Sequence, residues 1–458
     1  RSSDLKSLGS TIFDGCDKLK SVVIPASVTD IQTDTFDEYF DADANEGQGN
    51  VTFAEGSIFK LQNGVLYDSE NLIRVLDWQE NVVVPDGIKY IGADAFNAYS
   101  TQTPNNMETL KSITLPESLV SIGKTAFRAC KSLESITIPK NVSEIGDGAF
   151  VSCSSLATVE ILGPVKELTG INGVFSGCTA LKNVTLPATL TTLGKGSFNG
   201  CKALEEINLP EGLTEIGERA FFGCTNLKNI NIPDGVETVG KQVFGNCNSL
   251  ELAVIPASVT SIGQQAFQKA FNADGGSLVM LGAIPPELGN NVMGTAATKQ
   301  ENVTVYYPAA SEAAYKETDL VDEEDNGGYA LDLIDASMAL ANTRAADGNT
   351  LTLKTVTVPE GMTLTASSSD NTVATVDTTN GLVVTGIKEG TATITATLKV
   401  GDFVVLTDSC TVTVTAEGTV IPDVEEPQVS VDDSISTETD KETAKEVAGS
   451  VSADDVVS

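Results

Sequence analysis

A pattern of apolar and polar positions repeats along residues 1–270 of this chain. Phenylalanine marks the pattern, and most successive phenylalanines are 23 residues apart, with single steps of 25, 31 and 60 residues. Self-similarity at such a period predicts a stack of small structural units. The ten positions are Phe13, Phe36, Phe96, Phe127, Phe150, Phe175, Phe198, Phe221, Phe244 and Phe267.

The unit at residues 133–153 shows what each repeat forms. Ile136 and Ile138 alternate with polar residues, as the inward positions of a β-strand require. Pro139 ends the strand because it has no N–H for the ladder, and Gly146 permits a tight turn. One unit cannot bury its apolar face alone, so we expect neighbours to stack with paired strands about 4.8 Å apart.

The motif I-P-x-x-V-x-x-I-G-x-x-A-F-x-x-C-x-x-L recurs along residues 1–317. It resembles the BspA-like leucine-rich repeats of bacterial surface proteins. The resemblance implies a β-rich, right-handed solenoid of about 23-residue repeats over residues 1–270, with an insertion around residues 37–90. It also implies a C-terminal cap over residues 271–317, in which Pro308 and Tyr315 close the stack. It supplies no catalytic residue.

The composition changes after residue 317. Residues 318–328 are acidic and indicate a linker, and residues 329–417 contain short Thr- and Val-rich strands typical of a small β-sandwich. The run G-L-V-V-T-G-I-K-E-G-T-A-T-I-T-A resembles the group 2 bacterial immunoglobulin-like domain, which implies a spacer role. Ala366 departs from the tryptophan common in that family, so the core there must pack differently. Residues 418–458 form an acidic tail without aromatics, typical of a disordered stalk.

Cysteines follow the same period as the phenylalanines, each three residues after one of them. A line of residues does not converge on one point, so it is a poor zinc site. Two interpretations remain: buried free thiols that act as small hydrophobic residues, or disulfides between neighbouring repeats. The positions are Cys16, Cys130, Cys153, Cys178, Cys201, Cys224 and Cys247.

Between the inward strand positions lies a stripe of small polar residues that we expect to face solvent. Two roles are open for this stripe. It either supports cross-strand hydrogen bonding and solubility, or it forms a flat protein-binding face. Its candidate binding residues are Thr114, Thr137, Thr185, Asn208 and Asn231. The same two rows of positions continue through Glu160 and Val254, and through Ser112, Ser135, Thr158, Asn183, Glu206 and Asn229.

The insertion contains Trp78, the only tryptophan of the chain, with Tyr67 nearby. Apolar runs on either side of residues 68–71 predict a β-hairpin. The aromatic residues either form the core of that hairpin or offer a ligand-binding surface on the repeat scaffold, as insertions often do. Trp78 and Tyr67 are therefore also candidate binding residues.

The amino-acid composition restricts the partners and the kinds of site that this chain can have. The formal net charge of −35 disfavours nucleic acid as a partner, and it indicates a solvated acidic surface or diffuse calcium binding. The chain has no histidine, which removes the commonest general base and metal ligand. We predict no catalytic, cofactor or metal site. The chain contains no apolar run of about 18 residues, so we predict no direct membrane insertion of this segment.

The predicted function is that of a non-catalytic adhesin or binding protein, extracellular and at the bacterial cell surface. Its predicted partners are host or bacterial surface proteins or glycans, and we expect a monomer. The alternatives are a self-assembling structural component of the cell surface, a carbohydrate-binding surface protein and, third, a glycoside hydrolase with a carboxylate pair. The chain opens at Arg1 inside a repeat, so we expect a segment of a longer protein.

Overall fold

The computed structural model describes residues 4–14, 16, 19–36, 50–76, 79–97, 109–295, 303–308, 311–318, 320, 328–331, 340–344, 350–352, 363–379, 382–400 and 403–415. The chain divides into two compact units. Unit one comprises Arg1–Leu331 with Pro359–Gly361, and unit two comprises Asp332–Val358 with Met362–Ser458. The predicted β-rich architecture, a solenoid followed by an immunoglobulin-like region, is confirmed.

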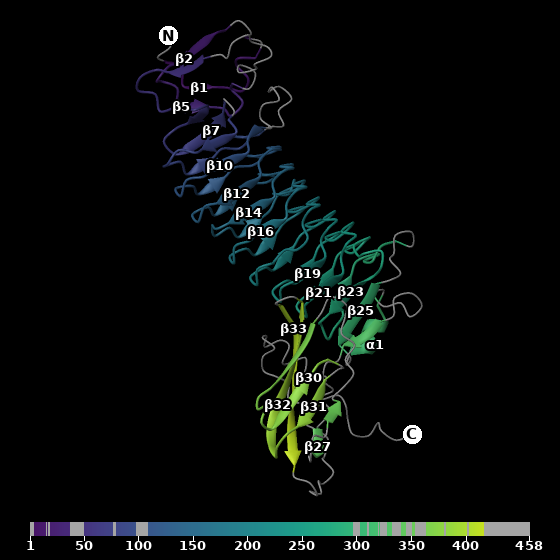
Figure 1. Ribbon diagram of the computed structural model, residues 1–458. Coiled ribbons are helices and arrows are strands. Elements are labelled where there is room, and N and C mark those ends of the chain that lie inside the picture. Colours follow the sequence, from purple (N-terminus) through teal and green to yellow (C-terminus); the bar gives the residue numbers. More distant parts are fainter. Residues whose placement is uncertain are drawn as a thin grey trace. The chain divides into compact units, whose positions relative to one another are not determined.

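Unit one is a stack of rungs, and most rungs contribute a strand to what we call the first strand row (Figure 1). Where neighbouring strands of this row pair, they pair in parallel, and a step of 23 residues separates Ser135 from its partner Thr158. The strands are β2 (Ser21–Ile24), β4 (Asn50–Phe53), β8 (Asn81–Val83), β10 (Ser112–Thr114), β12 (Ser135–Ile138), β14 (Thr158–Ile161), β16 (Asn183–Thr185), β19 (Asn229–Asn231), β21 (Leu252–Ile255), β23 (Gly276–Met280), β25 (Val303–Pro308) and β26 (Gly328–Leu331).

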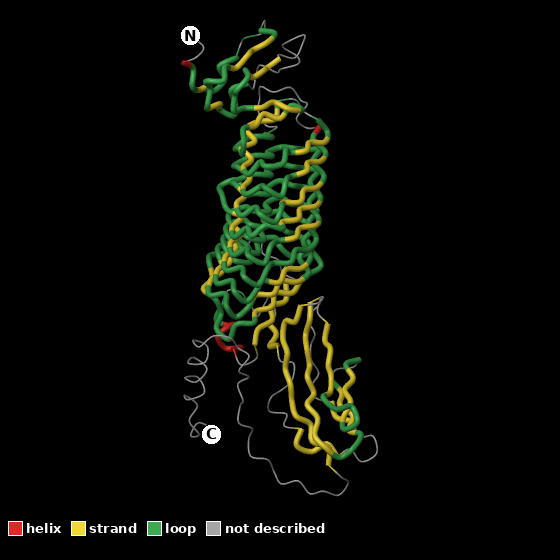
Figure 2. The backbone as a smooth tube through the Cα atoms, turned by 90° about the vertical axis from the view of Figure 1, so that its left-hand side faces the viewer, coloured by secondary structure: helices red, strands yellow, loops and turns green. Residues whose placement is uncertain are grey.

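A second strand row consists of two-residue strands that also pair in parallel. Figure 2 shows the two rows on opposite sides of the stack, with loops between them. Glycine permits this close stacking, because a Cβ on Gly146 would lie 2.5 Å from the backbone nitrogen of Lys124. The strands are β1 (Ser7–Leu8), β3 (Asp30–Ile31), β9 (Tyr90–Ile91), β11 (Ser121–Ile122), β13 (Glu144–Ile145), β15 (Glu167–Leu168), β17 (Thr192–Leu193), β18 (Glu215–Ile216), β20 (Thr238–Val239), β22 (Ser261–Ile262) and β24 (Glu287–Leu288).

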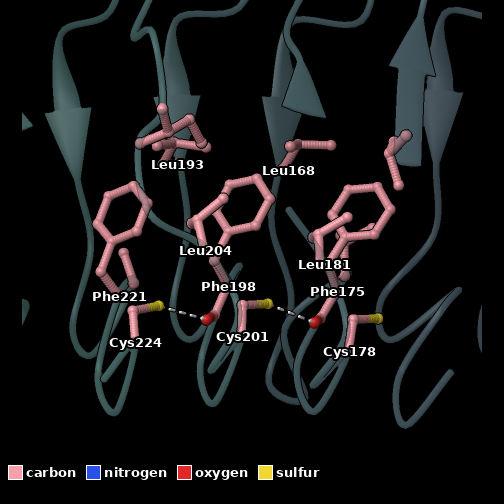
Figure 3. Packing of buried hydrophobic residues seen from close by; sticks show 14 of the residues in the cluster. Leu168, Phe175, Cys178, Leu181, Leu193, Phe198, Cys201, Leu204, Phe221 and Cys224 are labelled. Carbon is pink, nitrogen blue, oxygen red and sulfur yellow. Dashed lines mark hydrogen bonds between the residues drawn. The ribbon is translucent and has the colours of Figure 1, made fainter. Parts of the chain in front are cut away.

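The phenylalanines from Phe96 to Phe267 form a continuous stack inside unit one, part of which Figure 3 shows. The ring of Phe150 is 5.0 Å from that of Phe127 and 5.3 Å from that of Phe175, measured between centroids, with nearly parallel planes. All eight rings from Phe96 to Phe267 are fully buried. Each such pair adds about 0.5–1.5 kcal/mol to the gain from burial alone, so the stack is a main source of stability.

The cysteines form a parallel ladder beside these rings, and those of the described ladder are free thiols. From Cys130 onward, each Sγ donates a hydrogen bond to the backbone oxygen of the phenylalanine one rung before its own (Figure 3). Burial explains why these residues behave as small apolar residues. The six bonds are Cys130 to Phe96 (3.1 Å), Cys153 to Phe127 (3.0 Å), Cys178 to Phe150 (3.2 Å), Cys201 to Phe175 (3.3 Å), Cys224 to Phe198 (3.2 Å) and Cys247 to Phe221 (3.3 Å).

The insertion contains the predicted hairpin. Strands β5 (Lys60–Gln62), β6 (Val65–Tyr67) and β7 (Asn71–Val75) pair antiparallel, and β7 joins the second strand row at β9. The hairpin has two apolar faces that belong to different cores. Val65 packs into the core of the later rungs, whereas Leu66 packs into the core of the first two rungs. The hairpin thus separates these two cores.

The helix α1 (Glu312–Lys316) follows β25 and packs against the last rungs, and β26 adds a further strand beside β25. Tyr315 of this helix is fully buried, and its hydroxyl donates a hydrogen bond of 2.8 Å to the carbonyl oxygen of Gly282. Its ring stacks on that of Tyr307 at 5.2 Å. Burial holds the pKa of Tyr315 above its ordinary value. These contacts hold α1 against the last rungs of unit one, and the cap over residues 271–317 stays a prediction.

The described residues of unit two form two sheets. One has the strand order β27-β33-β32-β29 and the other the order β28-β31-β30. Leu382, Ile394 and Val412 are among the fully buried residues. The strands are β27 (Leu340–Arg344), β28 (Thr350–Thr352), β29 (Thr363–Ser368), β30 (Ala374–Asp377), β31 (Val383–Gly386), β32 (Gly390–Val400) and β33 (Phe403–Thr415).

Candidate functional site

The outward side of the first strand row carries the predicted stripe. In β12, Ser135 and Thr137 are exposed while Ile136 and Ile138 are buried, as strand alternation requires. We call the outward side chains of β10, β12, β14, β16, residues 206–208 and β19 the polar face. Because all these rungs point the same two positions outward, the polar face is built from two parallel columns of side chains.

Strand register aligns the columns from rung to rung. Thr137 lies opposite Glu160, and its hydroxyl donates a hydrogen bond of 3.3 Å to Glu160 Oε2. In the other column, Asn183 Nδ2 lies 3.5 Å from the hydroxyl oxygen of Thr158. These weak bonds leave most donors and acceptors of the exposed side chains available to a partner.

All five sheet residues predicted to bind lie on the polar face. Thr114, Thr137, Thr185 and Asn208 are exposed, and Asn231 is half-buried. Four of them come from strands, whereas Asn208 lies in a rung without an assigned strand. Strand register places Thr137, Glu160 and Thr185 in one column, and Thr114, Asn208 and Asn231 occupy the same position of their own rungs.

The predicted exposure of Val254 is wrong. Apolar side chains occupy both outward positions of β21 and one of the two in β23, and Leu252, Val254 and Val279 are each at most 1% exposed. Strands that are buried on both faces lose the alternation of apolar and polar residues. The polar face therefore ends at β19.

Charged side chains border the polar face and pair between neighbouring rungs. The distances between ammonium nitrogen and carboxylate oxygen are 2.9 Å for Lys111 and Glu80, and 3.5 Å for Lys228 and Glu205. All four side chains are about half exposed, so each pair contributes little to stability. Their effect is to keep the edges of the face hydrated.

The aromatic candidates of the insertion lie elsewhere. Tyr67 is 8% exposed, and its hydroxyl donates a hydrogen bond of 3.0 Å to Gln62 Oε1. Val65 and Leu66 of the same strand are buried as well, Val65 with Tyr67 in the core of the later rungs and Leu66 in the core of the first two. Trp78 lies outside the described residues. Binding by Tyr67 and Trp78 stays a prediction, and the burial of Tyr67 moves attention to the polar face.

One feature of the polar face was not predicted. The sheet formed by β12, β14 and β16 ends at β16, and the next begins at β19. Among the described residues, no backbone hydrogen bond joins Glu206–Leu209 to either strand, although Lys228 N–H still donates to Glu205 O at 3.0 Å. The sequence L-E-E-I-N-L-P follows the repeat pattern, so it contains no signal for this break.

Away from the polar face, the described residues show few groups that could bind a metal or that have a shifted pKa. Within the described ranges, no group of three or more His, Cys, Asp or Glu residues could hold a metal ion. Among exposed groups, a side-chain hydrogen bond with Glu70, at 2.6 Å, raises the pKa of Lys89. A side-chain hydrogen bond from Thr372 likewise lowers the pKa of Asp370. Both shifts arise from local surface pairs.

The described part of the chain has no helix long and apolar enough to cross a bilayer.

Two protein families match the sequence. The family described as "BspA type Leucine rich repeat region" matches in six copies over residues 2–73, 78–171 and 166–273, which is more than half of the chain. The family described as "Bacterial Ig-like domain (group 2)" matches residues 338–412. Neither is an enzyme family. No curated protein matches this chain.

Several solved structures are similar. A leucine-rich repeat protein from Eubacterium ventriosum is 27% identical over 44% of this chain, with a TM-score of 0.35, and this chain spans only 58% of its length. One from Bacteroides ovatus is 23% identical over 71% of this chain and 88% of its own, with a TM-score of 0.38. A leucine rich cell surface protein from Faecalibacterium prausnitzii is 24% identical over 58% of this chain and 80% of its own, with a TM-score of 0.33.

Proposed function

Because the chain belongs to the BspA-type leucine-rich-repeat proteins, we propose that it is a non-catalytic binding protein of the bacterial cell surface, with the polar face as its contact surface. The partner class is a protein on a host or bacterial surface. Unit two, which matches the bacterial Ig-like family, would act as a spacer.

The observation that carries this proposal is the two-column arrangement of exposed polar side chains across successive rungs. Thr114, Thr137 and Thr185 have few partners within the chain, and they project from strands whose other side is locked into the core. A rigid scaffold holds such groups in place before binding, so little side-chain entropy is lost on contact. Short side chains also leave the face flat enough for a protein surface.

The test is binding of the purified chain to immobilised matrix proteins, bacterial surface proteins and glycans. Thr137→Arg and Thr185→Arg would place bulky charges on the polar face, and we expect at least about tenfold weaker binding, which corresponds to about 1.4 kcal/mol. Thr238→Arg is the matched control, because Thr238 is an exposed threonine of the second strand row. It should bind as the wild type does.

Two results contradict the proposal. If the chain binds none of the proteins and glycans tested, the result argues against a binding role. If only Thr238→Arg loses binding, the contact surface is the second strand row and not the polar face. Light scattering over a range of concentrations tests the alternative of a self-assembling surface component, because that component grows in mass whereas a binding protein keeps the mass of its monomer.

A further inference from the structure

We propose that the end of unit one formed by its first rung, residues 5–24, is a second binding surface, and that it takes one more rung of the same repeat from another polypeptide. This surface is separate from the polar face, so the proposal goes beyond the proposed function. Core positions that are closed inside the stack are open in this rung.

Three apolar side chains of the first rung are exposed at repeat positions that belong to the core. Leu5, Ile12 and Leu19 are 42%, 45% and 36% exposed. They lie eight residues before Phe13, directly before it and six residues after it. The same three positions are fully buried in the rung of Phe150, at Val142, Ala149 and Leu156, and in the rung of Phe221, at Leu213, Ala220 and Leu227.

The opposite end of unit one is different. Tyr307 of β25 and Tyr315 of α1, which follow the last repeats, are fully buried. Exposed core positions are therefore a property of the first rung and not of both ends of the stack. Apolar side chains that gather on a surface mark an interaction site, because covering them removes apolar area from water.

The cysteine ladder indicates what covers this end. From Cys130 onward, each Sγ donates to the backbone oxygen of the phenylalanine one rung earlier. Cys16 occupies the same repeat position and is only half-buried, and among the described residues its Sγ has no acceptor. A rung that places its own phenylalanine over Phe13 brings the missing carbonyl oxygen. An apolar surface of another kind does not offer an acceptor at this point.

Strand pairing gives the occupant its register. Strand β1 pairs in parallel with β3, and β2 pairs in parallel with β4. Among the described residues, neither β1 nor β2 has a second neighbour. A further rung adds one strand beside each of them and repeats the contacts that hold successive rungs together. The occupant that fits side chains, thiol and strands at once is a rung of this repeat.

The experiment titrates a synthetic peptide with the sequence of residues 142–161 into the full chain. This segment carries one complete set of core positions, including Phe150 and Cys153. We expect saturable binding of one peptide per chain, and a peptide with Phe150→Asp should bind at least about tenfold more weakly, because a carboxylate cannot replace the ring.

A variant of the chain locates the binding surface. Ile12→Asp should weaken binding of the peptide at least about tenfold. Ile171→Asp is the matched control, since Ile171 is an isoleucine that is 81% exposed in another rung, and it should bind as the wild type does. Circular dichroism of both variants checks that unit one is folded.

Cys16 gives a readout that needs no change at the apolar positions. A bound peptide in which Cys153 is replaced by serine should slow the reaction of Cys16 with a disulfide reagent at least about tenfold, because it buries the thiol. Cys16→Ala should weaken binding of the peptide about threefold, which corresponds to the loss of one neutral hydrogen bond.

Three results overturn the proposal: no saturable binding, equal weakening by Ile12→Asp and Ile171→Asp, and a Cys16 that reacts equally fast with and without peptide. If the chain alone has twice its monomer mass in light scattering and Ile12→Asp restores the monomer, the end takes a second copy and the proposal fails. Thr137→Arg should leave binding of the peptide unchanged, so failure at this end and failure of the polar face are distinguishable.

Discussion

The thiol of Cys201 donates a hydrogen bond to the backbone oxygen of Phe175, one rung earlier, over 3.3 Å. The same oxygen also accepts the backbone N–H of Cys178 at 3.2 Å. The cysteine thus tethers the turn of one rung to the turn of the rung before it. Because six consecutive rungs repeat the contact, the cysteines are structural parts of the stack.

Replacing Cys201 by alanine should lower the free energy of unfolding by about 1–2 kcal/mol, because it removes a buried hydrogen bond and leaves a small void. The Phe175 oxygen keeps its bond from the Cys178 N–H, which limits the loss. Urea unfolding measures the effect. Cys16→Ala is the control, since Cys16 is only half-buried, and an equal loss in both variants contradicts the tether.

Phe221 and Phe222 are sequence neighbours with opposite roles. Phe221 is fully buried between Phe198 and Phe244, at centroid distances of 5.6 and 5.7 Å. Phe222 is half-exposed, with the Arg219 guanidinium 5.2 Å from its ring centroid.

Phe221→Ala should lower the free energy of unfolding by about 3–5 kcal/mol. Phe222→Ala should cost about 1 kcal/mol, since exposed cation–π contacts are weak. Thermal and urea unfolding of both variants measure the difference, and similar losses would show that the stack carries little of the stability.

Alkaline pH should destabilise unit one. Burial raises the pKa of Cys224 to about 12 and the pKa of Cys201 well above its ordinary value. The unfolded chain releases these protons at lower pH than the folded chain does, so stability present at neutral pH is lost as the pH rises above about 9. Cys201 and Cys224 each add up to roughly 1 kcal/mol of loss per pH unit.

Urea unfolding under reducing conditions, between pH 7.5 and pH 10, checks this expectation. Cys224→Ala should make the pH dependence less steep, because the variant has one thiol fewer to ionise on unfolding. A stability that does not change over this interval would show that the buried thiols ionise as readily in the folded chain as in the unfolded one.

The half-buried Cys16 should be the ladder thiol that reacts with a disulfide reagent in the folded protein. A Cys16→Ser variant should therefore lose one equivalent from the fast phase of the reaction. Cys130→Ser should leave the fast phase unchanged, since Cys130 is fully buried. A fast reaction of Cys130 would mean that the rungs open frequently.

The sequence predicted the features that a single rung determines. Alternation of Ile136 and Ile138 with polar residues indicated the strand and its outward face, and the period of the phenylalanines indicated stacking. Features that depend on several rungs were not predictable. Val254 occupies an outward position, yet it is buried, and that burial depends on residues outside its own rung. The break at Glu206–Leu209 occurs in a rung whose sequence follows the repeat pattern, because a ladder bond depends on two rungs and not on one.

The hairpin of β6 and β7 has a consequence for cooperativity. Its opposite faces fill two separate cores, and the phenylalanine stack is likewise divided, with Phe13 on Phe36 on one side and Phe96 on Phe127 on the other. A loss of packing in the first two rungs therefore has no continuous apolar path into the later ones. When the chain is pulled from its N-terminal side, those two rungs can come apart first, while the hairpin still seals the rest of the stack against water.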